Sequence, residues 1–376
     1  MDIAVNARLL IKDKLEGIGW FTYESFKRIT TQHPEHHFFF IFDRPFNPDY
    51  IFSGNITPIV LSPQARHPFL FWIWFDFSLP PLLQRLKPDL FVSPDGYLPT
   101  RSNIKSLAVI HDLNFEHYPK DLPYIVRKYY RHFFPKFALK ASRIATVSQF
   151  SKEDIIHQYH IPSDKIDVVY DGSSEVYSPI NEQEAKEVRD KYTGGAPYFV
   201  FIGSLHPRKN LANLFHAFDD FKNQKSSDVK LAIVGEKKWW TKEISKAFKN
   251  MDHSGDVVFC GRQKLLELRK ILASALALTY VSYFEGFGIP IVEAFRCHVP
   301  VITSNVTSMP EVAGGAALLV DPFNPASISD AMRKIHEDPD LRQDLILKGI
   351  ERSNEFTWQK TADRLWASIE KTIKTN

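Results

Sequence analysis

The sequence contains few cysteines and no long apolar stretch. Its 376 residues include two cysteines, Cys260 and Cys297, both in apolar surroundings. Two such residues fit reduced, buried thiols better than a disulfide framework or a metal site. No run of 18 apolar residues occurs, and the start, MDIAVNARLL, has an acid at position 2 and too short an apolar run for a signal peptide. We therefore expect a cytoplasmic protein.

Net charge is also low. The chain carries 47 lysines and arginines against 44 aspartates and glutamates, a net charge of +3 that does not indicate a nucleic-acid partner. One segment differs, because no acid occurs between Asp121 and Glu153, whereas bases do, at Arg127, Lys128, Arg131, Lys136, Lys140 and Arg143. Apolar side chains share it at helical spacing, namely Val126, Tyr130, Phe133 and Phe137. Such a helix can make peripheral contact with an anionic membrane, or it can be a core helix with a solvated basic face.

Several sequence fingerprints are missing. Neither Gly17-Ile-Gly19 nor Gly286-Phe-Gly288 continues to the third glycine of a dinucleotide site, which argues against NAD-dependent chemistry. The chain has no Walker-A pattern and no G-x-S-x-G. Asp338-Pro-Asp340 looks like a metal-binding D-x-D, but it lies in a polar turn between two late helices. We interpret it as a surface feature and expect no metal.

Apolar runs alternate with helical stretches along most of the chain. A chain of this length is usually too long for a single hydrophobic core, so we expect two domains. Alternation of this kind predicts parallel sheets with helices on both faces. The sequence turns polar between Val176 and Pro197, and a second alternating series follows. We predict two doubly wound α/β domains, residues 1–176 and 197–356, with a linker at 177–196 and a final helix at 357–376.

The stretch from Ser282 to Ala294, SYFEGFGIPIVEA, directly follows an apolar run, ALALTYV. It predicts a strand, a glycine turn and a helix start, with Pro290 at the first helical position, where no backbone donor is needed. Gly286 and Gly288 allow a sharp turn and close approach of the backbone to a ligand. The amides of a helix start form an anion site. A phosphate group could therefore bind here.

Two carboxylates flank that anion site. Glu285 precedes the predicted helix and Glu293 falls in its first turn. Because carboxylates accept hydrogen bonds from hydroxyl groups, the pair indicates a ligand that carries both phosphate and sugar hydroxyls. The alternative is an ordinary strand-to-helix turn with one solvated and one capping glutamate.

A second candidate stretch is GSLHPRKN, residues 203–210. Arg208 and Lys209 stand at the entrance to a predicted helix, where the helix dipole disfavours basic residues. They are either two solvated bases or a clamp for a diphosphate, and their unfavourable position supports the clamp. Such a pair would also stabilise the charge that grows on a departing diphosphate.

In open parallel sheets, ligands bind beyond the carboxyl ends of the strands. Here polar or glycine clusters follow six predicted strands: Gly17 and Gly19, His111-Asp112, Gly203 to Lys209, Gly235, Gly261 and Glu285. We therefore expect each cluster at the ligand-binding edge of its own sheet. His111 could donate a hydrogen bond to a sugar hydroxyl or simply satisfy a turn.

These motifs resemble those of the retaining nucleotide-sugar glycosyltransferases of family 4. The family's E-x7-E motif appears as Glu285 to Glu293, and its G-x4-R-K pattern as Gly203, Arg208 and Lys209. Residues 304–322, SNVTSMPEVAGGAALLVDP, match its usual downstream stretch. The resemblance implies the GT-B architecture, in which two Rossmann-like domains face a central cleft.

The resemblance also implies roles for single residues. Glu293 would bind the ribose hydroxyls and Glu285 the donor sugar, while Arg208 and Lys209 would hold the leaving diphosphate. Gly203 would belong to the phosphate-binding pattern, Gly17 and Gly19 would close over the cleft, and the loop with Arg262 and Leu265 would meet the base. In the donor-site loop that begins at Gly286, the stretch Phe287, Gly288 and Ile289 would give amides to the sugar and the diphosphate. His111 would contact the sugar near its 6-hydroxyl. One departure is Asp171-Gly172, where the family usually has Asn-Gly, which puts a donor contact in question.

The implied reaction is transfer of a hexose from a nucleoside diphosphate sugar to an acceptor hydroxyl with retention, without metal or cofactor. The likeness of VNARLL, HDL and GSLHPRKN to polysaccharide mannosyltransferases suggests GDP-mannose as the donor. The acceptor would be an oligosaccharide or a lipid-linked sugar in bacterial polysaccharide or glycolipid synthesis. The alternatives are a nucleotide-sugar epimerase, a sugar phosphorylase, or a non-catalytic nucleotide-sugar binding protein.

Overall fold

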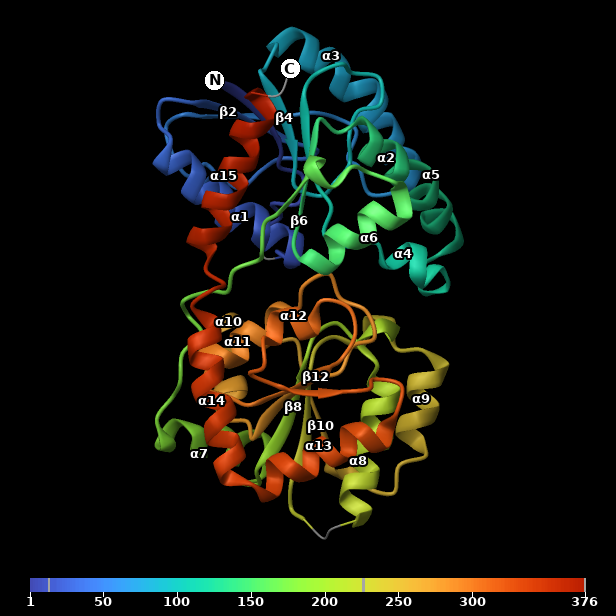
Figure 1. Ribbon diagram of the computed structural model, residues 1–376, viewed down its shortest axis with the longest axis vertical. Coiled ribbons are helices and arrows are strands. Elements are labelled where there is room, and N and C mark those ends of the chain that lie inside the picture. Colours follow the sequence, from blue (N-terminus) through green and yellow to red (C-terminus); the bar gives the residue numbers. More distant parts are fainter. Residues whose placement is uncertain (13, 225–226, 375–376) are drawn as a thin grey trace. The chain divides into compact units, whose positions relative to one another are not determined.

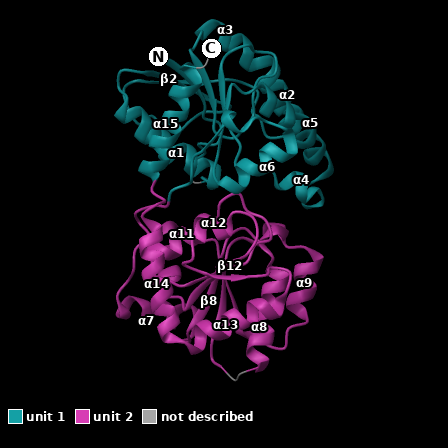
Figure 2. Cartoon of the chain, in the orientation of Figure 1, with its two compact units in different colours: residues 1–172, 358–376 teal, residues 173–357 magenta. Residues whose placement is uncertain are grey.

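The computed structural model describes residues 1–12, 14–224 and 227–374 (Figure 1). The chain divides into two compact units, one formed by residues 1–172 and 358–376 and the other by residues 173–357 (Figure 2). Each unit has one parallel sheet, as the alternating pattern predicted. Within the described ranges, none of the helices combines the length and the apolar character needed to span a membrane.

The first unit is built on a seven-stranded sheet in the order β3-β2-β1-β4-β5-β6-β7. Its strands are β1 (Asp2–Asn6), β2 (His37–Phe42), β3 (Ile56–Val60), β4 (Leu90–Ser93), β5 (Ser106–Val109), β6 (Arg143–Thr146) and β7 (Ile166–Val168). Its helices are α1 (Gly17–Gln32), α2 (Pro68–Ile73), α3 (Leu79–Leu86), α4 (Asn114–His117), α5 (Tyr124–Lys140), α6 (Gln149–Tyr159) and α15 (Trp358–Lys374).

Alternate residues of one strand in this unit belong to two different cores. Ile3 and Val5 of β1 pack in the core that contains residues of α1 and α15. Ala4, between them, packs in the core that contains residues of α3, α5 and α6. The sheet is therefore covered on both faces, which is why its strands are continuous apolar runs.

The second unit has a six-stranded sheet in the order β10-β9-β8-β11-β12-β13. Its strands are β8 (Tyr198–Ile202), β9 (Lys230–Val234), β10 (Val257–Gly261), β11 (Ala277–Tyr280), β12 (Val301–Ser304) and β13 (Leu318–Val320). Its helices are α7 (Glu182–Thr193), α8 (Leu211–Gln224), α9 (Lys242–Lys249), α10 (Leu265–Ala273), α11 (Ile289–Arg296), α12 (Met309–Ala313), α13 (Pro325–Glu337) and α14 (Pro339–Ser353). Every residue of the central β8 is buried.

The unit boundaries differ from the predicted linker at 177–196. That stretch lies inside the second unit and contains α7, which begins after an Asn181 cap. Only Ala185, Val188 and Thr193 of α7 are buried. A helix that buries so narrow a stripe has the polar composition of a linker, so composition alone could not separate the two.

The last helix, α15, is part of the first unit, where it packs along α1. The Thr361 hydroxyl donates to the Tyr170 carbonyl at 2.8 Å, and the Ser368 hydroxyl donates to Asp167 at 2.8 Å. Leu365 and Ile369 of α15 are fully buried. The chain therefore passes between the units twice, after Gly172 and after Thr357.

Candidate functional site

The loops after β8 and β9 meet at the carboxyl edge of the second unit's sheet. Gly235, which follows β9, has a φ of +158°, and a Cβ there would lie 1.9 Å from the carbonyl oxygen of Gly203, which follows β8. The Gly203 amide donates to the Val234 carbonyl at 3.0 Å. Only glycine allows this approach, because any side chain at 235 would collide with backbone. The close contact fixes the start of the segment that carries the two bases.

Arg208 and Lys209 lie in a short 3-10 turn, Pro207–Lys209, just before α8. The Arg208 guanidinium donates from Nη1 to Glu285 Oε2 at 2.5 Å and to the Phe284 carbonyl at 3.1 Å. Lys209 Nζ donates to Glu285 Oε1 at 2.5 Å and to the Tyr280 hydroxyl at 2.5 Å. Because β8 and β11 are neighbours in the sheet, bases and acid meet at one place. We call Arg208, Lys209, Glu285 and Tyr280 the Glu285 cluster.

The Glu285 cluster is buried except for Arg208, which is partly exposed, and it carries one excess positive charge. Glu285 is 5% exposed and Lys209 is 7% exposed. Burial by itself would raise the pKa of Glu285, but the charges of Arg208 and Lys209 outweigh it and lower that pKa to about 2. Glu285 is therefore ionised at neutral pH and can accept, but not donate, hydrogen bonds, for example from hydroxyl groups.

The loop that carries Glu285 is fastened to the segment before α12. The Ser308 hydroxyl donates to the carbonyls of Glu285, at 3.0 Å, and of Phe287, at 2.9 Å. The Glu285 amide donates to the Thr307 hydroxyl at 3.3 Å. Gly288 then precedes the helix with a φ of +109°, which is unfavourable for other residues. These contacts hold the loop at the start of α11 in one conformation.

The α11 helix starts one residue earlier than predicted. It begins at Ile289, so that Pro290 is its second residue and Glu293 opens its second turn, whereas we expected Pro290 first and Glu293 in the first turn. Pro290 still occupies a position whose amide would have no helical partner. The start of α11 thus presents the donor-rich end that the sequence indicated.

Glu293 has a partner that the sequence analysis did not identify. The Tyr177 hydroxyl, on a side chain 4% exposed, hydrogen-bonds to Glu293. Burial raises the pKa of Glu293 to about 7, and this hydrogen bond opposes the rise. Tyr177 lies in a mostly polar stretch that we took for the start of a linker, and that stretch contains a second tyrosine, Tyr192. Nothing in the local sequence therefore singled out Tyr177 as a partner of Glu293.

Arg262 and Leu265 lie at the carboxyl end of β10, which is separated from β11 by β9 and β8. Arg262 is exposed, and Leu265 is the first residue of α10. Both these residues and the Glu285 cluster lie at the carboxyl ends of strands, but β10 is the outermost strand of the sheet, three positions away from β11. A base bound there would lie several strands away from a sugar bound at Glu285.

His111, in the first unit, follows β5 as expected. Its Nε2 donates to the Pro94 carbonyl at 2.8 Å. Burial lowers the pKa of His111, although the Pro94 hydrogen bond opposes that effect, so the ring is neutral at physiological pH. With Nε2 engaged as the donor, Nδ1 can only accept. Of our two interpretations of His111, the hydrogen bond to Pro94 fits a ring that satisfies the local backbone. Nδ1 of the neutral ring could accept from a sugar hydroxyl but could not donate to it.

Gly17 and Gly19 lie within α1 rather than before it. The helix begins at Gly17 itself. A Cβ at Gly19 would lie 3.0 Å from the Leu9 carbonyl oxygen, so the glycine lets the strand-to-helix loop pack closely on α1. Gly19 therefore has a packing reason of its own, whereas a Cβ at Gly17 would meet no atom within 4 Å.

A buried polar network at the carboxyl ends of β1 and β4 escaped the sequence analysis. Arg8 Nε donates to Asp95 at 2.6 Å, and the Asn6 amide donates to the same carboxylate at 2.8 Å. The Arg8 guanidinium also lies 4.6 Å from the centre of the Tyr97 ring. Asn6 is the last residue of β1, and Arg8 comes just after it. The rule that polar residues after strands mark a site would therefore have found Arg8, had it been applied to this strand.

Asp171, where the family usually has asparagine, is 5% exposed. Burial raises its pKa to about 8, and its Oδ1 has no hydrogen-bond partner among the described residues. A protonated carboxyl group offers one donor and one acceptor, much as an amide does. The departure from Asn-Gly therefore leaves a donor group at this position at neutral pH.

The Asp338-Pro-Asp340 motif lies on the surface, as we interpreted it. Both acids are exposed, and the Asp338 carboxylate accepts from the Leu341 amide at 2.8 Å, which caps α14. An N-cap of this kind is a sufficient reason for the first aspartate.

Comparison with known proteins connects these features to one family. Residues 17–173 match the model of "Glycosyltransferase Family 4", and residues 182–352 match that of "Glycosyl transferases group 1". O-antigen chain mannosyltransferase B of Escherichia coli is 30% identical over 282 residues, covering 74% of this chain and 73% of the relative. O-antigen chain mannosyltransferase RfbU of Salmonella typhimurium is 28% identical and covers 77% of this chain and 76% of its own.

Solved structures show the same fold at lower identity. Sucrose-phosphate synthase of Thermosynechococcus elongatus has a TM-score of 0.77 at 16% identity over the whole of both chains. Anabaena Alr3699/HepE in complex with UDP and glucose has a TM-score of 0.75 at 16% identity, covering 99% of this chain and all of its own. Taken with the relatives and the motifs at the sheet edge, these matches show that the chain belongs to glycosyltransferase family 4 and has the GT-B fold.

Proposed function

We propose that this glycosyltransferase transfers mannose from GDP-mannose to an acceptor hydroxyl with retained anomeric configuration, in the synthesis of a bacterial polysaccharide such as O-antigen. The observation that carries the proposal is the Glu285 cluster, which combines two bases and an ionised acid beside the start of α11. The names of the mannosyltransferase relatives support the choice of sugar. The choice of guanine as the base of the donor, and of a polysaccharide precursor as the acceptor, rests on the same similarity to mannosyltransferases.

In the proposed reaction, Arg208 and Lys209 bind the diphosphate and neutralise the charge that grows as it leaves. Glu285, held in place by both bases, accepts hydrogen bonds from sugar hydroxyls, and Glu293 accepts them from the ribose. The bond between the anomeric carbon and the diphosphate oxygen breaks, and the acceptor oxygen bonds to the anomeric carbon on the same face. The acceptor proton passes to the diphosphate oxygen, so no covalent sugar–enzyme intermediate is required.

The same two bases would take the place of a metal ion. Lysine and arginine provide charge and directed hydrogen bonds to phosphate oxygens, and the amides of a helix start add more. Initial rates of nucleotide release should therefore be unchanged by excess EDTA. Loss of activity in EDTA, restored by added Mg²⁺ or Mn²⁺, would contradict the metal-independent mechanism.

The α5 helix would provide peripheral contact with a membrane that holds a lipid-linked acceptor. Tyr129, Phe134 and Phe137 bury one face of the helix in the core, whereas Tyr124 and Ile125 are 57% and 58% exposed beside the basic residues. Exposed apolar and basic side chains together favour anionic lipid surfaces. Sedimentation with liposomes should increase with their content of phosphatidylglycerol, and binding that ignores lipid charge would contradict this role.

The activity is tested with a panel of nucleoside diphosphate sugars, measured for nucleotide release with and without lipid-linked oligosaccharide. We expect release that depends on the acceptor, highest with GDP-mannose, and proton NMR of the product should show the anomeric configuration of the donor. An epimerase would convert the donor without acceptor, a phosphorylase would need free phosphate, and a binding protein would release no nucleotide. Any of these three results would overturn the proposal.

A further inference from the structure

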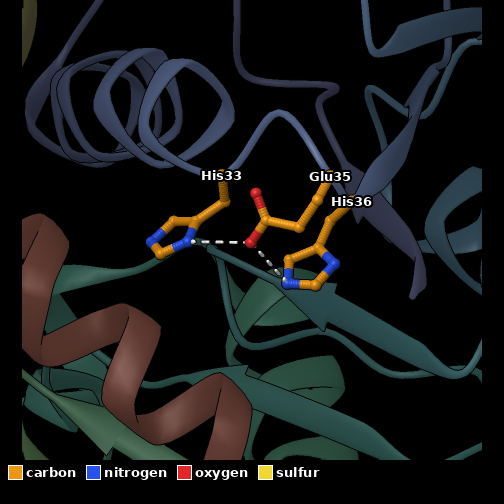
Figure 3. Close-up of side chains that lie close together, drawn as sticks. All are labelled: His33, Glu35 and His36. Carbon is orange, nitrogen blue, oxygen red and sulfur yellow. Dashed lines mark ion pairs between the residues drawn. The ribbon is translucent and has the colours of Figure 1, made fainter.

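The turn between α1 and β2 brings together three potential metal ligands, His33, Glu35 and His36 (Figure 3). Glu35 Oε1 lies 3.6 Å from His33 Nδ1 and 3.2 Å from His36 Nε2. The ligand atoms of all three side chains lie within 4.8 Å of one another. Among the described residues, no other group of three or more histidines, cysteines or acids has its ligand atoms this close together.

The two imidazole rings are held in place by packing. The His33 ring stacks on the Trp366 indole of α15, with ring centres 3.8 Å apart, and the His36 ring stacks on the same indole at 5.1 Å. Neither ring therefore has to lose much rotational freedom when it binds an ion.

The backbone of the turn is fixed as well. One side-chain amide, that of Asn55, donates to three carbonyl groups: Thr30 at 3.1 Å, His33 at 3.2 Å and His36 at 2.8 Å. The His36 amide also donates to the His33 carbonyl at 3.2 Å. The backbone from which the two histidines project is therefore held in one conformation.

The ligand types and their spacing select the ion. Imidazole and carboxylate groups suit zinc and its neighbours in the first transition series. Two ligands of one tetrahedral zinc ion lie about 3.3 Å apart, because zinc–ligand bonds are about 2.0–2.1 Å long. The observed 3.2 and 3.6 Å lie on either side of that value. Glu35, 59% exposed at its side chain, has room to adjust.

We propose that His33, Glu35 and His36 form a binding site for a divalent transition-metal ion, with zinc as the preferred probe and water in the remaining position. The site lies at the amino end of β2, which is the opposite edge of the sheet from the carboxyl end of β5 that carries His111. Its ion therefore ties the α1–β2 turn in place beneath α15 and takes no part in sugar transfer. The proposal does not depend on the proposed function.

Isothermal titration of the EDTA-treated full chain with ZnCl₂ tests the site. We expect one saturable ion per chain, a rise in Tm with zinc, and affinity lower by about 10-fold or more in Glu35→Gln and His33→Gln. The matched control is His157→Ala, an exposed histidine of α6 in the same unit, which should bind zinc as the wild type does. Glu35→Gln keeps the shape of an exposed side chain, so its folding should be intact.

Two results would overturn the site: no saturable zinc binding to the wild type, or zinc affinity that is unchanged in both Glu35→Gln and His33→Gln. If Glu35 served only as an ion-pair partner of the histidines, Glu35→Gln would lower the Tm equally with and without zinc. Sugar-transfer rates in EDTA are measured in parallel and should not change. Failure of the transferase assay would leave the zinc result standing by itself.

Discussion

The hydroxyl group of Tyr177, near the start of the second unit, hydrogen-bonds to the carboxyl group of Glu293 in the α11 helix. Both groups are affected by burial, which raises the pKa of Glu293 to about 7 and that of Tyr177 well above its ordinary value. Glu293 therefore changes charge within the physiological pH range. Any ligand that needs its carboxylate form must bind in a pH-dependent way.

Tyr177→Phe should make that dependence visible. Without the hydroxyl group, the pKa of Glu293 rises further, so a larger fraction of the carboxyl group is protonated at pH 7. We expect GDP affinity at pH 7 to fall about fivefold, the equivalent of one hydrogen bond of about 1 kcal/mol, and the acid limb of its pH profile to move to higher pH.

The matched control is Tyr192→Phe, which removes the 2.7 Å hydrogen bond from an outlying tyrosine to Glu267 in the same unit. Titration calorimetry with GDP between pH 5.5 and 8.5 measures both variants. A uniform loss of affinity at every pH would indicate a packing defect and contradict the role of the hydroxyl group.

Glu293→Gln should change how stability depends on pH. Because the pKa of Glu293 is raised on folding, from 4.5 to about 7, its contribution is fully present below the unfolded value and is lost as pH rises through 7. The variant lacks this titration. Relative to wild type, its free energy of unfolding in urea should therefore improve steadily from pH 5 to pH 8. A difference that stays constant over that range would mean that Glu293 does not titrate there.

Lys209→Met should abolish most of the activity without unfolding the protein. The side chain is 7% exposed and bonds to Glu285, which keeps its second partner, Arg208, in the variant. Loss of one directed charge at the leaving group should reduce kcat by about 10²–10³-fold.

A matched control is Lys222→Met, which removes another buried lysine of the same unit, paired with Asp256 at 2.7 Å. It should reduce the Tm but leave kcat per folded molecule near wild type. Steady-state kinetics alongside thermal unfolding separates the two effects. Equal kcat losses in both variants would show that Lys209 acts through stability alone.

Gly235→Ala should disrupt the edge of the second sheet. The new Cβ would meet the Gly203 carbonyl oxygen at 1.9 Å, and the backbone φ of +158° adds strain. We expect a loss of about 2–4 kcal/mol in the free energy of unfolding, typical of backbone strain combined with a steric clash. Gly255→Ala, which meets no atom within 4 Å, is the control and should be nearly neutral in urea denaturation. A neutral Gly235→Ala would mean that the loops can separate without penalty.

Much of the fold followed from local pattern. The apolar run ALALTYV predicted a buried strand, and β11 lies there. The glycine turn before α11 was placed correctly within one residue, because turn and helix-start chemistry depends on neighbours along the chain. The predicted linker at 177–196 shows the limit, since a solvent-exposed helix such as α7 and a linker share one composition.

The sequence by itself determined the two alternating series, the family motifs and the strand ends at which polar groups gather. Only the tertiary structure decided how those groups pair. Arg208 and Glu285 are 77 residues apart in the chain, and it is the adjacency of β8 and β11 that lets one guanidinium and one ammonium hold the pKa of Glu285 at about 2. The same holds for the hydrogen bond of His111 to Pro94, the raised pKa of Asp171 and the hydrogen bond between Tyr177 and Glu293. Charge state and hydrogen-bond direction depend on burial and on partners brought from distant positions, and no local pattern records them.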